Sequence, residues 1–135
     1  MDWTKDAWNT FHIIALEYEL KSHKYSDWLK FIEIFRRAIV CDTCKMDFAK
    51  ILATPTSNKM KPFTHSVYLH NMVNIKLNKP RYTLQNALNK YSSMPSIAIN
   101  QTISDYAKIL IKYVKKGDVN KRDVDELFHY LQTYL

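Results

Sequence analysis

The residues with the clearest chemical potential are two cysteines, Cys41 and Cys44, which are the only cysteines in the chain. A Cys-x-x-Cys pair forms either a redox-active disulfide or half of a zinc site. His65 and His70 could complete a Cys2His2 zinc set, although 20 residues separate Cys44 from His65. A thioredoxin-like redox site uses the same motif but requires alternating strands and helices. The cysteine spacing alone therefore leaves more than one chemistry open.

A second pattern lies in the segment from His70 to Pro80. Read as a helix, it places four residues at i, i+3, i+4 and i+7 on one face, namely His70, Val73, Asn74 and Leu77. An imidazole and a carboxamide between aliphatic side chains suit a flat heteroaromatic ligand better than a metal ion. Zinc also gives no role to Asn74, Lys79 or Trp8. A redox disulfide beside an organic cofactor is the favoured interpretation, with zinc as the alternative.

The elements that must position these residues are predicted to be helices. One glycine, Gly117, and four prolines provide little turn chemistry for a many-stranded β protein. Thr4, Ser26 and Thr83 are expected N-caps, and Gly117 suits the residue after a helix end. Apolar spacing predicts helices over about residues 4–20, 26–39, 41–52, 63–78, 83–91 and 96–116, and a last helix that reaches 135. The expected fold class is all-α.

The motifs resemble those of the Erv/ALR family of FAD-linked sulfhydryl oxidases. In that family a Cys-x-x-Cys is followed by a helix of the form His-Asn-x-Val-Asn-x-x-Leu-x-Lys-Pro, and this chain matches every specified position from His70 to Pro80. The segment from Lys5 to Tyr18 is similar to the family's first helix, which has a basic residue followed by Trp, His and Tyr. The similar blocks span about residues 5–91. Cellular members often have Trp where this chain has Tyr91, and with a single cysteine pair the chain is more similar to small virus-encoded members.

The resemblance implies a fold, an activity and a set of site residues. The implied fold is an FAD-binding four-helix bundle with a short fifth helix over residues 1–95, and residues 96–135 form two additional helices packed on the same domain. The implied activity is oxidation of protein dithiols to disulfides, with oxygen as acceptor and hydrogen peroxide as product. Cys41 would be the outer, substrate-attacked sulfur, and Cys44 would lie against the flavin. The implied cofactor contacts are Lys5, Trp8, His12, Tyr18, His70, Asn71, Val73, Asn74, Leu77, Lys79, Lys90 and Tyr91.

The partners follow from the same resemblance and from the cysteine count. Family members commonly dimerise, so a homodimer is expected. Because no cysteine lies outside Cys41 and Cys44, the chain has no second shuttle pair, and we expect a dithiol protein substrate or a separate thioredoxin-like carrier. Two other classes remain open: a structural zinc-binding helical interaction domain, and a basic helical adaptor without catalysis.

The charge and the length bound the remaining possibilities. A chain of 135 residues is expected to form one domain, and its net charge of +7 raises the question of nucleic-acid binding. The basic residues are spread from Lys5 to Arg122 without a recognition motif, so no nucleic-acid partner is expected. Part of the charge, chiefly Lys76 and Lys79, is expected beside the cofactor pyrophosphate.

The N-terminal residues bear on localisation. Asp2, Lys5 and Asp6 interrupt any apolar run of signal-peptide type, and no apolar stretch reaches the length of a membrane span. We therefore expect a cytoplasmic protein without a membrane partner, in the host cytoplasm or the virion if the chain is virus-encoded.

Overall fold

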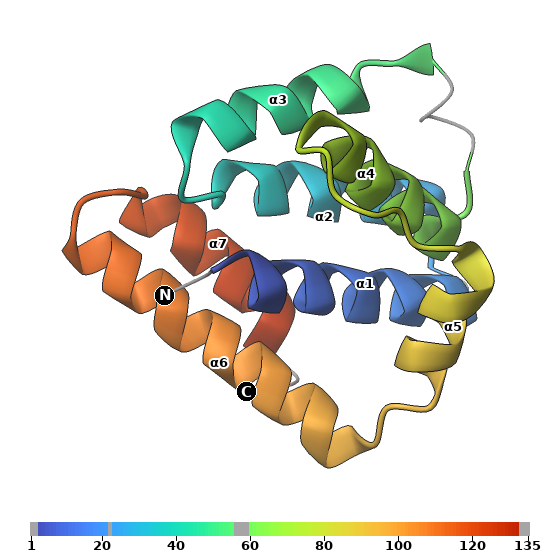
Figure 1. Ribbon diagram of the computed structural model, residues 1–135. Helices are drawn as coiled ribbons and strands as arrows, with labels where there is room; N and C mark the ends of the chain where they lie inside the picture. The colour runs from blue at the N-terminus through green and yellow to red at the C-terminus, as the bar shows by residue number, and fades with distance from the viewer. Residues whose placement is uncertain (1–2, 22, 56–59, 133–135) are drawn as a thin grey trace.

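The computed structural model describes residues 3–21, 23–55 and 60–132, and in these residues it contains helices and their connections but no strand (Figure 1). The all-α prediction is therefore confirmed. The end of the predicted last helix, residues 133–135, lies outside the described residues. The helices are α1 (Thr4–Leu20), α2 (Tyr25–Arg37), α3 (Asp42–Leu52), α4 (Pro62–Lys76), α5 (Leu84–Ser92), α6 (Ser96–Lys115) and α7 (Lys121–Leu131).

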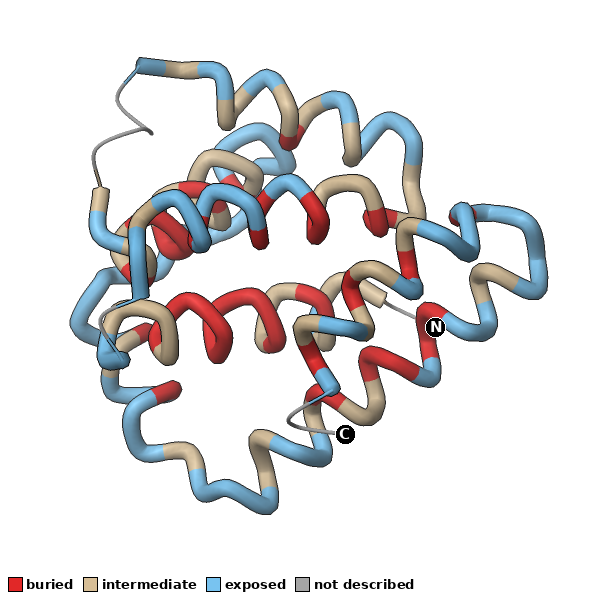
Figure 2. The backbone as a smooth tube through the Cα atoms, turned by 180° about the vertical axis from the view of Figure 1, so that it is seen from behind, coloured by how far each residue is buried: buried red, intermediate tan, exposed pale blue. Residues whose placement is uncertain are grey.

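Helix α1 runs through the middle of the molecule, with α3 and α4 above it and α6 below it in Figure 1, and it packs against α2, α4, α5 and α6. All residues from Thr10 to Leu16 are buried, and in Figure 2 this stretch is an almost continuous red band. A helix that is covered on every face forms the centre of a core rather than its edge. Its polar members, Thr10 and His12, are therefore enclosed as well.

The two C-terminal helices share this core with the rest of the bundle. Helix α6 packs against α1, helix α7 packs against α2, and the two pack against each other. Aromatic contacts join them to α2, because Tyr106 lies 6.3 Å from Phe35 and Tyr130 lies 6.2 Å from Phe31 between ring centroids. Their fully or almost fully buried side chains include Ile103, Tyr106, Leu110, Val124, Leu127 and Leu131.

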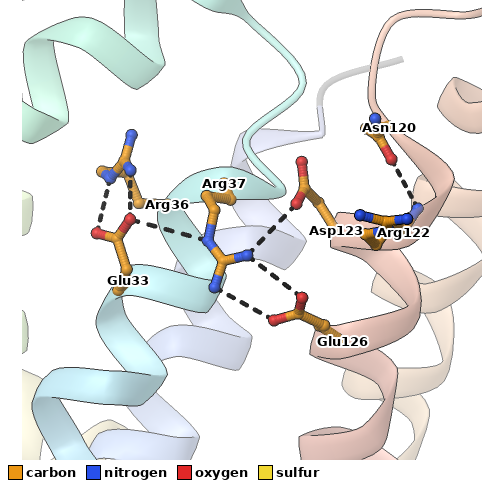
Figure 3. A network of polar contacts seen from close by, with 7 residues as sticks. All are labelled: Glu33, Arg36, Arg37, Asn120, Arg122, Asp123 and Glu126. Atoms are coloured by element: carbon orange, nitrogen blue, oxygen red, sulfur yellow. Dashed lines mark hydrogen bonds and ion pairs between the residues drawn. The ribbon is translucent and has the colours of Figure 1, made fainter.

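A polar network also ties α7 to α2. Figure 3 shows Arg37 of α2 pointing toward Asp123 and Glu126 of α7, with Nη2 3.2 Å from the Glu126 carboxylate and Nη1 3.6 Å from Asp123. Glu33, one turn earlier on α2, lies 3.8 Å from the Arg37 Nε. Because the Arg37 side chain is 35% exposed, water screens these pairs and their net contribution to stability is small.

The ends of α4 and α6 have the same geometry. After α6, Gly117 has φ of 80°, and the N–H groups of Gly117 and Asp118 bond the carbonyls of Val114 and Tyr113, so Gly117 occupies the predicted position. After α4, Asn78 takes φ of 56° in the corresponding place. Here Lys79 N–H bonds the Asn74 carbonyl at 2.8 Å, and the chain turns back along α4.

The predicted N-caps had mixed outcomes. The Thr83 hydroxyl accepts a hydrogen bond from Asn86 N–H, so this prediction is confirmed. Thr4 is already helical, with Trp3 as N-cap, and Ser26 lies inside α2, which begins at Tyr25. Both predictions were wrong, because a cap contributes only about 1 kcal/mol and the burial of an apolar helix face outweighs it.

The packing of α7 predicts how two substitutions differ in stability. Leu127→Ala removes atoms from a position with 0% exposure and should lower the free energy of unfolding by about 2–5 kcal/mol. Arg37→Gln breaks the partly exposed pairs of Figure 3 and should lower it by less than about 1 kcal/mol. Urea unfolding of the full chain, followed by circular dichroism, measures both. Equal, small losses would contradict the placement of α7 in the core.

Candidate functional site

A pocket of about 520 Å³ is enclosed by α1, α2, α3, α4, the segment after α4, and α5. This volume lies within the range of about 300–1,000 Å³ found for ligand sites. The structure brings most of the predicted site residues to its wall, although they come from distant parts of the chain. The predicted residues that line the pocket are Lys5, Trp8, Cys44, His70, Val73, Asn74, Leu77, Lys79, Lys90 and Tyr91.

The cysteines lie at the start of α3 and form a disulfide. Their Cα atoms are 5.2 Å apart, which is ordinary for a disulfide. Cys41 is the N-cap of α3, and its Sγ accepts a hydrogen bond from Cys44 N–H at 3.2 Å. Cys44 lines the pocket and is exposed, whereas Cys41 is partly buried and does not line it. The disulfide is thus open to solvent and touches the pocket through Cys44.

Aromatic rings form one wall of the pocket beside Cys44. The rings of Trp8 and His70 are stacked, with centroids 4.1 Å apart and planes inclined by 6°. Phe48 lies 6.1 Å from Trp8, and Tyr82 lies 5.1 Å from His70. Flat rings at this spacing offer stacking surfaces to an aromatic ligand.

Two histidines from different helices are joined behind this wall. His12 Nε2 of α1 lies 2.9 Å from His70 Nδ1 of α4, and His12 Nδ1 lies 2.9 Å from the Ser66 hydroxyl. Burial, together with the charges of Lys90 and Lys79, lowers the pKa of His70 to about 4. Burial, then His70 and Lys90, lowers the pKa of His12 well below its ordinary value. Both rings are therefore neutral at neutral pH. His12 itself does not line the pocket and acts on it through His70.

The two asparagines of the α4 motif hold the backbone that follows α4. Asn71 Nδ2 donates to the Tyr82 carbonyl, and Tyr82 N–H donates to Asn71 Oδ1, both at 2.8 Å. Asn74 is buried and donates to the Pro80 carbonyl at 3.2 Å. Asn74 lines the pocket and Asn71 does not. Asn71 instead fixes the position of Tyr82, which does line it.

Tyr91 closes the pocket from α5. Its hydroxyl donates to Asn9 Oδ1 at 2.6 Å, and its ring lies 5.1 Å from that of His12. Burial, followed by the Tyr82 hydroxyl, raises the pKa of Tyr91 above its ordinary value. Lys90 Nζ also donates to Asn9 and lies 5.2 Å from the Tyr91 ring. Asn9 thus fastens α5 to α1 at the rim of the pocket.

The charge on the pocket wall is mainly positive. Its cationic side chains are those of Lys5, Lys76, Lys79, Arg81 and Lys90, all on exposed residues. Asp47 of α3 is the one carboxylate among the lining residues of the described chain, and it is paired with Lys76 at 2.5 Å. The excess of cations suits an anionic ligand, above all one that bears phosphate groups.

The structure does not bring Tyr18 to this pocket. Tyr18 lies ten residues after Trp8 on α1, which corresponds to about 15 Å along a helix. Its ring contacts Trp28 at 6.0 Å and Phe31 at 5.9 Å, and burial raises its pKa to about 12. Its assignment as a cofactor contact stays a prediction, without support from its position.

The described residues contain no group of three or more His, Cys, Asp and Glu side chains that could hold a metal ion. His65, one of the two candidate zinc ligands, is buried and its Nδ1 accepts a hydrogen bond from Trp28 Nε1 at 3.1 Å. Along the part of the chain that the structure describes, none of the helices combines the length and apolarity required to cross a membrane.

Several lining residues were not predicted from the sequence. Phe48 lies four residues after Cys44, so the helical spacing of α3 could have identified it. Arg81 and Tyr82 follow Pro80 and reach the pocket because the chain turns back after α4. Asn9 carries no such signal, since its role depends on a contact with Tyr91, 82 residues away.

Searches of curated proteins and of solved structures gave no match. The sequence model of the Erv1 / Alr family matches residues 5–92, which include every residue that lines the pocket except Trp3 and Thr4. The match covers more than half of the chain, including Cys41, Cys44 and the segment from His70 to Pro80. The chain therefore belongs to the Erv1 / Alr family, the family of FAD-linked sulfhydryl oxidases.

Proposed function

We propose that this protein is an FAD-dependent thiol oxidase that forms disulfides in protein substrates. Cys41 and Cys44 form its redox centre, and oxygen accepts the electrons and is reduced to hydrogen peroxide. The observation that carries the proposal is the contact of the Cys41–Cys44 disulfide with the pocket through Cys44. The stacked rings of Trp8 and His70 line the same pocket. A redox-active pair beside an aromatic, cation-rich pocket suits transfer of electrons between thiols and a flavin.

The chemistry of the pocket fits both the aromatic rings and the pyrophosphate of FAD. Trp8, His70 and Tyr82 offer ring surfaces, and Val73 and Leu77 offer aliphatic contact. The lysines and the arginine on the pocket wall would hold the pyrophosphate, since they exceed the single carboxylate of Asp47. When bound, FAD supplies the two-electron carrier between the reduced cysteines and oxygen.

The cysteines would have different roles. A substrate thiolate attacks the Cys41 sulfur and forms a mixed disulfide, while Cys44 leaves as a thiolate. A second substrate thiol then releases the substrate disulfide, and both cysteines are reduced. The start of α3 favours thiolates, because its unpaired N–H groups and helix dipole stabilise negative charge there. The exposed Asp42 in the first turn opposes this effect in part.

The substrate is proposed to be a dithiol protein or a thioredoxin-like carrier. In-line attack on Cys41 requires an accessible thiolate, which a folded client with recessed cysteines does not offer. The chain has no further cysteine that could extend its reach. A homodimer is also proposed. Because α6 and α7 already cover parts of α1 and α2, the dimer interface would not include those covered parts.

The first prediction is that the purified protein is yellow and binds one noncovalent FAD per chain. His70→Ala should lower FAD affinity by at least about tenfold and reduce the gain in melting temperature on FAD addition, because a ligand of the folded state stabilises it. His129→Ala, at an exposed histidine of α7, is the matched control and should leave both unchanged. Absorbance, chromatography of the released cofactor and melting curves measure the effects. Colourless protein with stoichiometric zinc would favour the alternative, a structural zinc-binding interaction domain.

The second prediction separates the two sulfurs. In Cys41→Ser the remaining Cys44 thiolate would lie beside the bound cofactor and give a long-wavelength absorption band that grows as the pH rises. Cys44→Ser should lack this band. Both variants should lose dithiol oxidase activity almost completely, whereas Thr43→Ala, at an exposed residue between the cysteines, should retain it. A band in Cys44→Ser instead of Cys41→Ser would reverse the two roles.

The third prediction concerns the carrier. The full chain should turn over a small dithiol and a reduced thioredoxin-like protein at least about tenfold faster than a large reduced client, because the client cannot align a thiolate with Cys41. Adding catalytic amounts of the carrier should restore client oxidation. Oxygen consumption with each substrate gives the rates, and Cys41→Ser supplies the background. Direct oxidation of the large client at the carrier's rate would overturn the requirement.

A further inference from the structure

A chain of hydrogen bonds runs from the backbone of α4 through α1 and back to the pocket. The Ser66 hydroxyl lies 2.7 Å from the Phe63 carbonyl oxygen and 2.9 Å from His12 Nδ1. His12 Nε2 lies 2.9 Å from His70 Nδ1. Ser66 is 0% exposed and His12 is 2% exposed, so water cannot substitute for these partners. Ser66 was not among the predicted site residues, and it does not touch the pocket.

The hydrogen bond from Ser66 to the Phe63 carbonyl fixes which atom donates in each of the other hydrogen bonds. A carbonyl oxygen only accepts, so the contact between Ser66 and Phe63 uses the single hydroxyl proton of Ser66. The Ser66 oxygen must then accept from His12, which places a proton on His12 Nδ1. A neutral His12 has a bare Nε2, which accepts from His70 Nδ1–H.

The groups around the two rings favour this neutral arrangement. Burial and the charge of Lys90 hold the pKa of both histidines below the ordinary range, and Lys79 adds to this effect at His70. The rings of Tyr91 and Tyr82 contact His12 and His70, respectively. With one proton per ring and His70 Nδ1 protonated, His70 Nε2 carries a lone pair. This nitrogen has no hydrogen-bonding partner among the residues that the structure describes.

We propose that Ser66 is a positioning residue that locks His12 and His70 in the Nδ1–H tautomer, so that His70 offers Nε2 as a hydrogen-bond acceptor to an N–H or O–H group of the ligand in the pocket. The stacking of Trp8 on His70 holds the ring plane, and Ser66 sets which nitrogen carries the proton. The statement about the ligand rests on the proposed function, since FAD has hydroxyl and amino groups that can donate. The statement about the tautomers concerns the protein alone.

Replacing Ser66 should reverse the direction of the hydrogen bond between His12 and His70. In Ser66→Ala, His12 Nδ1 loses its acceptor, and a buried N–H without a partner is unfavourable. The rings can avoid this state if His12 takes the Nε2–H tautomer and donates to His70 Nδ1. His70 then carries its proton on Nε2 and presents a donor where the ligand needs an acceptor.

The test is side-chain nitrogen NMR on the protein, with Thr10→Val as the matched control. Like Ser66→Ala, Thr10→Val removes one buried hydroxyl, and the Thr10 hydroxyl has no partner among the described residues. Nitrogen shifts and proton couplings report the tautomer of each histidine with and without FAD. Titration of the FAD-depleted proteins with FAD gives the affinities.

We expect Nδ1–H for His12 and His70 in the native protein and in Thr10→Val, and Nε2–H for both in Ser66→Ala. FAD affinity should fall roughly tenfold in Ser66→Ala and stay unchanged in Thr10→Val. A native His70 with Nε2–H would overturn the inference, and so would an unchanged tautomer in Ser66→Ala. If Ser66→Ala does not fold, the native tautomers alone decide. A protein that has the expected tautomers but binds no FAD would refute the proposed function and leave the role of Ser66 intact.

Discussion

The complete burial of α1 is the constraint on which the rest of the structure depends. Seven consecutive residues, Thr10 to Leu16, are shielded from water, so helices must cover α1 on every side. Apolar members of this stretch satisfy the requirement by packing alone. His12 cannot, because a buried ring nitrogen without a partner is costly. The contacts of His12 with Ser66 and His70 of α4 meet that need, and they fix the registry of the two helices that carry Trp8 and His70.

The pocket follows from this registry. Helix α4 is set against α1 by the histidines and by Glu19, whose carboxylate accepts Phe63 N–H at 3.1 Å in the first turn of α4. Helix α3, which carries Cys44, meets α4 through the pair of Asp47 and Lys76. A disulfide on one helix and an aromatic wall on two others are therefore held together by contacts that lie outside the redox motif. The Cys-x-x-Cys motif therefore indicates a cofactor-linked disulfide only when the segment from His70 to Pro80 is also present.

The sequence was sufficient for the helices and for most of the pocket, because both depend on local spacing. The positions i, i+3, i+4 and i+7 after His70 share a face in any helix, and Val73, Asn74 and Leu77 do reach the pocket. It was insufficient where a side chain had a choice of partners. Asn71 fits the motif yet bonds the backbone of Tyr82. Tyr18 fits the motif of the first helix but contacts Trp28 and Phe31. Helical spacing predicts which face of the helix a residue is on, but not whether the pocket extends that far along the helix axis.

The C-terminal helices show that the hydrophobic core extends beyond the family match. The match ends at residue 92, before α6 begins at Ser96, but the buried side chains continue through Leu131. Helix α6 covers the side of α1 that α4 leaves free, and α7 covers α2. Without them, apolar surface of both helices would face water, at a cost of about 25 cal/mol for each Å² exposed. The enclosure of α1 therefore depends in part on residues outside the family match, whereas the hydrogen-bonding partners of His12, Ser66 and His70, lie within it.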